Sequence, residues 1–138
     1  MTIVRWSETY ETGIPRIDVQ HRDLLQTINR LHECVHAGAG PEKILSTLTF
    51  LIEYAETHFR EEETLMQKSD FPGLEEHRNE HQSFASKVIG FRAQLQTEGS
   101  NLHPADLILF IVGWFSAHIM ETDMQMRDWV HPRIQHSA

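Results

Sequence analysis

The 138-residue chain contains little cysteine, few basic residues and no long apolar run. Its one cysteine, Cys34, allows no internal disulfide and fits a reducing compartment. Lysine and arginine total 12 against 20 acidic residues, a net charge of −8, which argues against nucleic-acid binding because phosphates need cationic partners. The longest strongly apolar run, Leu107 to Phe115, falls short of the roughly 20 residues that cross a bilayer.

The N-terminal segment MTIVRWSETYE also lacks the apolar core of a secretory signal. From these absences we expect a cytoplasmic protein that binds neither nucleic acid nor membranes. The 40% of hydrophobic and 23% of charged residues are typical of a globular chain, and the length is close to the roughly 100–200 residues of one domain. We therefore expect a single domain that covers residues 1–138.

Glycine and proline are scarce, and they gather at a few breaks between long segments with the 3.6-residue periodicity of amphipathic helices. Asp18 is a plausible N-cap for the first segment, and Pro41 and Pro104 stand where a first helical turn begins. The predicted elements are an N-terminal arm over about residues 1–17 and helices over about 18–37, 41–66, 74–97 and 104–128.

Short connections between four such helices imply antiparallel neighbours. The sequence thus predicts an all-α fold, an up-down-up-down antiparallel four-helix bundle with an extended N-terminal arm. The arm contains Trp6 and Tyr10, whose rings we expect to dock on the bundle.

The feature that stands out is histidine, of which the chain has 10. Six polar residues continue the apolar stripes of the predicted helices, where they face inward: His21, His58, Glu62, His77, His81 and His118. An unpaired polar group in an apolar interior costs several kcal/mol, so these side chains need partners. Metal ions meet this need, because imidazole suits iron and zinc and a carboxylate can bridge two ions.

The spacings support a metal site. His58 and Glu62 are four residues apart, as are His77 and His81, so each pair shares one helical face. His118 and Asp123 are five apart, about 140° around a regular helix. Either Asp123 spans two metals while His118 binds one, or a local π-bulge aligns the two side chains; we predict one or the other.

Each residue alone has an ordinary structural explanation. A single histidine on an apolar stripe is more often a hydrogen-bonded core residue than a ligand, and Glu62 alone would pass for part of a solvated acidic face. Chance is a weaker explanation than metal binding for the whole set, because all four predicted helices carry a polar residue on the apolar stripe. His32 and His36 form another pair at helical spacing, but no further ligand is apparent for them, and we expect surface histidines there.

The sequence resembles the hemerythrins, specifically the single-domain bacterial members. The resemblance covers about residues 6–128, and its motifs are specific because seven ligand positions must coincide in order and spacing. The matching pieces are Ile17-Asp18-Val19-Gln20-His21, His58-Phe59-Arg60-Glu61-Glu62, Phe71-Pro72-Gly73-Leu74-Glu75-Glu76-His77, Glu80-His81 and Trp114-Phe115-Ser116-Ala117-His118-Ile119 with Asp123.

This resemblance implies a non-haem site of two iron ions with an oxo or hydroxo bridge. One iron would be held by His77, His81 and His118 and the other by His21 and His58. Glu62 and Asp123 would bridge both irons.

An apolar dioxygen pocket would be formed by Trp114, Phe115 and Ile119, which match the wall positions of the family. Phe115 stands where the family usually has leucine, and Met126 stands where it often has an aromatic residue. We therefore expect the oxygen affinity and the autoxidation rate of this chain to differ from those of the family.

The resemblance points to dioxygen as the partner. Two six-coordinate irons offer about twelve positions. The histidines, the two bridging carboxylates and the oxygen bridge leave one vacancy, on the iron with two histidines. We expect a monomeric, non-enzymatic protein for oxygen storage or transport, with an unidentified oxygen-accepting protein as a further partner. The alternatives are a di-iron oxidase, a peroxidase or nitric-oxide-handling enzyme, and an oxygen or redox sensor.

Overall fold

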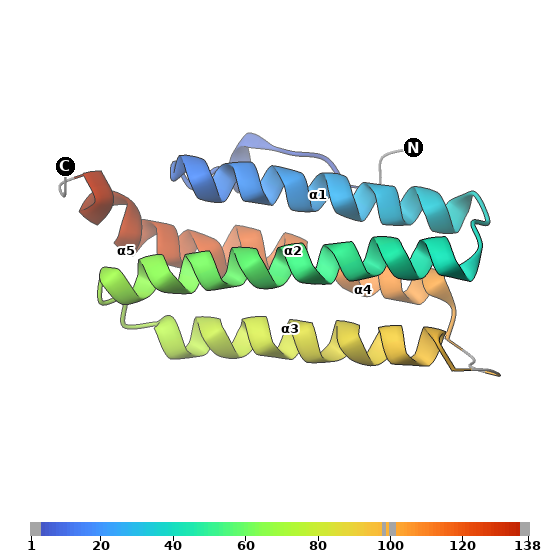
Figure 1. The fold of residues 1–138 in the computed structure, drawn as a ribbon. Helices are drawn as coiled ribbons and strands as arrows, with labels where there is room; N and C mark the ends of the chain where they lie inside the picture. Colours follow the sequence, from blue (N-terminus) through green and yellow to red (C-terminus); the bar gives the residue numbers. More distant parts are fainter. Residues whose placement is uncertain (1–3, 98, 100–101, 136–138) are drawn as a thin grey trace.

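The computed structural model describes residues 4–97, 99 and 102–135, which form four antiparallel rods (Figure 1). The rods are α1 (Pro15–His36), α2 (Pro41–Lys68), α3 (Leu74–Leu95), and a fourth built from α4 (Pro104–Ala117), the π-helical turn η2 (His118–Thr122) and α5 (Asp123–Gln135). Rods α1 and α3 each pack against α2 and α4, and this described part contains no strand. The predicted all-α, up-down-up-down bundle is confirmed.

Proline and glycine set several helix ends. Pro15, Pro41 and Pro104 each begin a helix, where proline has a suitable φ and lacks an N–H that would have no partner anyway. After α1 the chain reverses at Gly38, whose φ of 69° suits glycine. The Ala39 N–H then donates to the carbonyl oxygen of Cys34 at 2.9 Å, which closes the end of the helix.

The start of α1 differs from the prediction: the helix begins at Pro15, so Asp18 is not its N-cap. The buried carboxylate of Asp18 instead accepts the N–H and the hydroxyl of Thr12, both at 2.8 Å, and the N–H of Gly13 at 3.1 Å. Proline at the first position lets the helix start without a side-chain cap. Asp18 therefore ties the arm to the first helix.

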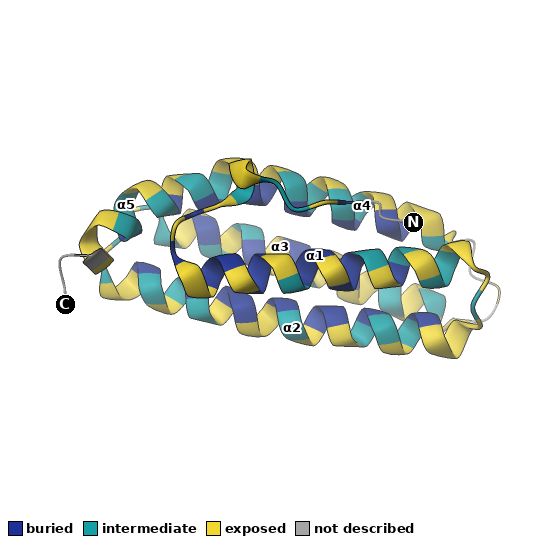
Figure 2. Cartoon of the chain, turned by 90° about the horizontal axis from the view of Figure 1, so that it is seen from above, coloured by how far each residue is buried: buried dark blue, intermediate teal, exposed yellow. Residues whose placement is uncertain are grey.

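The arm lies along the bundle near α1 and the fourth rod (Figure 2). It contains a 3-10 turn, η1 (Glu8–Tyr10), and the half-buried rings of Trp6 and Tyr10 pack against the apolar core as predicted. The two rings meet edge to face at 5.8 Å, and the guanidinium of Arg22 lies 4.6 Å from the centre of the Trp6 ring.

The last rod runs to Gln135, seven residues beyond the predicted end at about residue 128. Its final turns are held by contacts that the sequence pattern does not display. The indole N–H of Trp129 donates to the carbonyl oxygen of Ser69 at 2.7 Å, and Val130 is fully buried. Tertiary contacts thus extend this helix through Pro132.

By composition and length, the rod Pro104–Ile134 is able to cross a membrane, and it is the one such helix in the described part of the chain. In this fold 39% of its most apolar window is buried inside the bundle. The expectation that the protein binds no membrane stays a prediction.

The interior consists of two apolar clusters with a polar layer between them. The smaller cluster contains Ile14, Ile17, Met66, Met126 and Val130, and the larger one fills the other end of the bundle. On α1, for example, His21 lies between Ile17 of the smaller cluster and Leu24 of the larger one. The buried inner faces of the helices are visible in Figure 2. The polar layer is therefore shielded from water at both ends.

Candidate metal centre

The structure brings all seven predicted ligands into this polar layer. They come from all four rods, and each has at most 2% of its surface exposed: His21, His58, Glu62, His77, His81, His118 and Asp123. Their ligand atoms form two groups that share both acids. We call His77, His81 and His118 the three-histidine group, and His21 and His58 the two-histidine group.

Glu62 turns one oxygen toward each group. Its Oε1 lies 3.3 Å from His77 Nε2 and 3.2 Å from His81 Nε2. Its Oε2 lies 3.0 Å from His58 Nε2 and 3.3 Å from His21 Nε2. A carboxylate that divides its oxygens in this way has the geometry of a bridge between two cations.

Asp123 divides its oxygens in the same way. Its Oδ1 lies 3.0 Å from His77 Nε2 and 3.1 Å from His118 Nε2, and its Oδ2 lies 3.1 Å from His21 Nε2. The π-helical turn His118–Thr122 makes this possible, because its wider winding brings residues five apart onto one face. Of the two explanations left open for the spacing of His118 and Asp123, the structure shows the π-bulge, and Asp123 also reaches both groups.

The donor set fits a pair of metal ions better than a network of hydrogen bonds. Five buried ligand atoms have no hydrogen-bond partner in the described part of the chain: Nε2 of His58 and of His77, Oε1 of Glu62, and both oxygens of Asp123. Each nevertheless lies 3.0–3.3 Å from at least one other ligand atom of the cluster. Two ligands bound at about 2.1 Å and at right angles around one ion are about 3 Å apart, which matches this spacing.

Groups of opposite charge face one another within the cluster. Burial lowers the pKa of His21 and His77, but the nearby carboxylates of Asp123 and Glu62 favour the protonated rings, outweigh burial and raise both pKa values to about 9. For His58 burial wins and lowers the pKa. Burial opposes ionisation of the two acids, yet the surrounding histidines hold the pKa of Glu62 and of Asp123 well below the usual range. Both acids are therefore ionised at neutral pH, as ligands of a cation must be.

Aromatic rings cover the cluster on the side of the larger apolar cluster. Phe59 stacks on His81 with 3.9 Å between ring centres, and Trp114 stacks on His118 at 4.3 Å. Phe115 and Ile119 are each 1% exposed, whereas Trp114 is half-buried. All three predicted wall residues belong to the same apolar cluster, and their part in a dioxygen pocket stays a prediction.

Three side chains that hold the outer nitrogens of the histidines were missed by sequence reasoning: Gln20, Glu63 and Glu80. Each stands next to a predicted ligand in the chain, which is the signal that could have found them. Neighbours on a helix point about 100° apart, so a residue beside a ligand faces sideways toward the adjacent helix.

The other conspicuous histidines lie outside the cluster. The rings of His32 and His36 stack at 5.9 Å, and within the described residues they join no group of three or more metal-binding side chains. The ring of His131 packs beside Gly13, where a Cβ would lie 2.9 Å from its Nε2. Glycine at that position, with a φ of 76°, leaves room for the ring.

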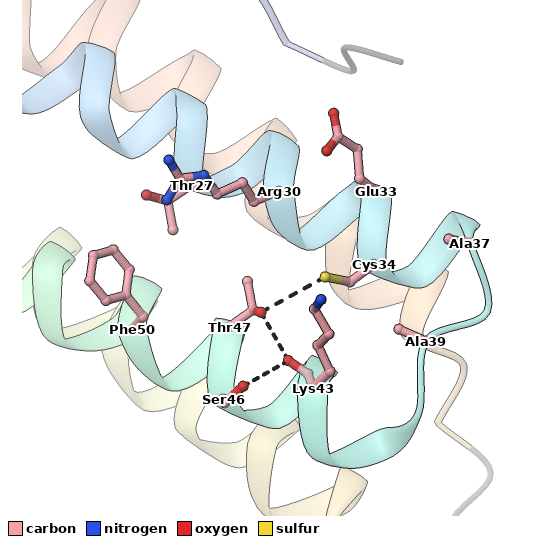
Figure 3. A pocket seen from close by; sticks show the side chains of 10 residues that line it. All are labelled: Thr27, Arg30, Glu33, Cys34, Ala37, Ala39, Lys43, Ser46, Thr47 and Phe50. Carbon is pink, nitrogen blue, oxygen red and sulfur yellow. Dashed lines mark hydrogen bonds between the residues drawn. The ribbon is translucent and has the colours of Figure 1, made fainter.

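A surface hollow lies apart from the metal centre. It has a volume of about 550 Å³ and lies between the end of α1 and the start of α2, where Cys34, Lys43 and Phe50 contribute to its lining (Figure 3). None of the seven ligands lines it. The seven ligands themselves are at most 2% exposed, so the cluster is buried within the bundle.

Comparisons with known proteins agree with this architecture. Residues 12–130 match the family model described as the hemerythrin HHE cation binding domain. The chain is 32% identical over 126 residues to a bacteriohemerythrin of Clostridium acetobutylicum (89% of this chain, 98% of the relative) and 31% identical over 127 residues to one of Methylococcus capsulatus (89% and 93%).

Solved structures resemble the whole fold. A crystal structure described as a leucine-to-phenylalanine mutant superposes with a TM-score of 0.86 at 25% identity, covering 94% of this chain and 98% of that one. The crystal structure of a wild-type hemerythrin gives a TM-score of 0.84 at 24% identity, covering 93% and 98%, which bears on the fold alone.

Proposed function

The chain belongs to the hemerythrin family, and from this premise we propose that it binds dioxygen reversibly at a pair of iron ions. The observation that carries the proposal is the division of oxygens: Glu62 and Asp123 each turn one oxygen toward the two-histidine group and the other toward the three-histidine group. When bound, two bridged iron ions supply the electrons that reversible binding of dioxygen requires.

The protein's part is to hold this pair and leave one position accessible. The two-histidine group offers one imidazole fewer than the other, so we place the open position on its side. The bridging acids fix the separation of the ions, because each is anchored on a different rod, Glu62 on α2 and Asp123 on α5. Ligands from four rods resist movement of the ions during oxygenation.

Exclusion of water is the second task of the chain. Phe115, Ile119 and the face of Trp114 line the larger apolar cluster beside the histidines. An apolar wall admits dioxygen and slows the entry of water and the escape of reduced oxygen species. Such a wall supports reversible binding rather than turnover.

The donor set also favours a binding protein over an enzyme. Ferritin-like di-iron enzymes use a carboxylate-rich set, whereas this cluster has five imidazoles and two carboxylates. Both acids already face the two histidine groups, which leaves neither free to serve as a general base. As the physiological role we propose storage or transport of oxygen by a cytoplasmic monomer, with an oxygen-accepting protein as its partner.

An oxygen-cycling experiment tests the proposal. Protein loaded anaerobically with Fe(II) is exposed to oxygen and then to argon through several cycles while visible absorption and iron content are recorded. We expect two irons per chain and an absorption band that appears and disappears with each cycle. Steady consumption of a reductant with accumulating product would identify an oxidase, and an oxygen-dependent change of shape or of partner capture would identify a sensor.

A variant pair tests the bridging role of Glu62. Glu62→Ala removes one of the two shared carboxylates and is expected to lower iron content sharply. Glu56→Ala, a change of an exposed glutamate on the same helix, serves as the matched control and should keep two irons. Full iron content in Glu62→Ala, measured by metal analysis on folded protein, would contradict the bridge.

A further inference from the structure

Three imidazoles of the cluster are held from outside by a side chain of the preceding rod. Rod α1 holds a histidine of α2, α2 holds one of α3, and α3 holds one of η2. The contacts run from Gln20 Oε1 to His58 Nδ1 at 2.7 Å, from Glu63 Oε2 to His81 Nδ1 at 2.8 Å, and from Glu80 Oε1 to His118 Nδ1 at 3.4 Å. These contacts fix the ring orientations while each Nε2 faces the centre.

The charge of these outer partners is unevenly distributed. Both carboxylates hold members of the three-histidine group, whereas the two-histidine group has the uncharged amide of Gln20. The Nδ1 atoms of His21 and His77 have no hydrogen-bond partner in the described part of the chain. Negative charge from the outer hydrogen-bond partners therefore reaches the imidazoles of the three-histidine group only.

The two carboxylates differ in their own surroundings. The hydroxyl of Thr122 donates to both oxygens of Glu80 at 3.0 Å, and Thr122 belongs to the same π-helical turn as His118. Glu63 instead accepts from the guanidinium of Arg78 at 3.1 Å, which offsets part of its charge. The contact of Glu80 with its histidine is thus longer than that of Glu63, but the charge of Glu80 is not offset by a guanidinium. Both side chains reach solvent, with 45% of Glu80 and 20% of Glu63 exposed.

Such partners change the electron donation of a histidine. When Nδ1–H donates to a carboxylate, the ring gains negative charge and Nε2 becomes the more basic ligand. An amide oxygen orients the ring without adding charge. A metal on the carboxylate-supported side is consequently easier to oxidise than one on the amide-supported side.

We propose that Glu63 and Glu80 are positioning residues that make the three-histidine side of the metal pair the first to lose an electron. Gln20, on the same reasoning, orients His58 while keeping the two-histidine side electron-poor. Removal of one electron from the reduced pair then leaves the two-histidine side, where we place the open position, in the reduced form. This inference rests on the proposed function, because it requires two irons in the cluster.

The test is a stepwise redox titration of iron-loaded protein, with ferricyanide as the one-electron oxidant and dithionite as the reductant. Glu80→Gln is expected to disfavour the first oxidation about tenfold, a rise of about 59 mV in the first midpoint potential, and to leave the second nearly unchanged. Gln20→Glu is expected to lower the second potential more than the first. Glu56→Gln removes the same charge from an exposed site on α2 and should move neither potential.

Two patterns would overturn the proposal. One is a Glu80→Gln variant that shifts both potentials equally or behaves like Glu56→Gln, since the carboxylate would then act only as a distant charge. The other is a Gln20→Glu variant that changes the first potential more than the second. A wild-type protein that fails to load two irons or to cycle with oxygen contradicts the proposed function itself, whereas unchanged potentials in a protein that cycles contradict only this inference.

Zinc-loaded protein provides a second measurement that does not depend on iron loading of the variants. In its proton–nitrogen NMR spectrum we expect the Nδ1–H proton of His81, which donates to a carboxylate, farther downfield than that of His58, which donates to an amide oxygen over nearly the same distance. Glu80→Gln should move the resonance of His118 and leave that of His81 in place. Equal shifts for His58 and His81 in the wild-type protein would show that the amide and the carboxylate do not differ in donation, and the proposal would fail.

Discussion

Removal of the metal should destabilise the fold strongly, because the cluster joins all four rods through buried polar atoms. Five ligand atoms of the cluster are buried without a hydrogen-bond partner in the described residues, on His58, Glu62, His77 and Asp123. An unsatisfied buried polar atom costs about 1–3 kcal/mol, so five of them set a range of about 5–15 kcal/mol.

Attraction between the histidines and the two acids, at 3.0–3.3 Å, offsets part of this cost in the metal-free protein. We therefore expect metal binding to add at least about 4 kcal/mol to the free energy of unfolding. For a chain of this length, 1 kcal/mol corresponds to about 3 °C in Tm, so the expected rise is at least about 12 °C.

The assay is calorimetric unfolding of protein prepared with a chelator and of the same protein loaded anaerobically with Fe(II). Glu62→Ala should lose most of the metal-dependent rise in Tm, whereas Glu56→Ala should keep it. A difference in Tm below about 3 °C between the two forms of the wild-type protein would refute the reasoning, since the orphaned atoms would then be satisfied without metal.

Three further predictions concern the chain around the centre. Burial and a 2.9 Å hydrogen bond to Asp23 raise the pKa of Tyr54 to about 12. This tyrosine therefore stabilises the fold below about pH 10, and its contribution is lost as the pH rises toward 12. Urea unfolding of Tyr54→Phe should show a free energy of unfolding that depends less on pH between about 10 and 12. Asp18→Ala should lower the free energy of unfolding by about 2–4 kcal/mol, because three hydrogen bonds to a buried carboxylate are lost. A decrease below about 0.5 kcal/mol in denaturant unfolding would contradict the anchoring of the arm by Asp18. Phe115→Leu leaves a gap in the wall and should speed autoxidation of the oxygenated protein, followed by visible absorption; an unchanged rate would remove Phe115 from the wall.

Most of the architecture could be read from periodicity, because four amphipathic segments separated by short breaks have few ways to bury their stripes. The exceptions lie where tertiary contacts decide. Asp18 reaches back to Thr12 and holds the arm instead of capping α1, and the extension of α5 depends on Trp129 and Val130. A helix-periodicity rule contains no term for such contacts.

The seven ligands of the candidate site could be predicted from helical spacing, but the side chains that hold the histidines from outside could not. Histidines and acids on apolar stripes must meet inside the bundle, and five imidazoles and two acids do so. Gln20, Glu63 and Glu80 interrupt no stripe, so no local pattern marks them until the neighbouring rods are in place.

The amino-acid sequence by itself determined which side chains turn inward, since a polar residue at an apolar position of a helix is identified by spacing alone. Only the tertiary structure decided how those side chains face one another. It resolved the five-residue step from His118 to Asp123 into a π-helical turn, and it turned one oxygen of each acid toward each histidine group. The physical reason is that direction around a helix is a local property, whereas distances of about 3 Å between four rods depend on how all of them pack.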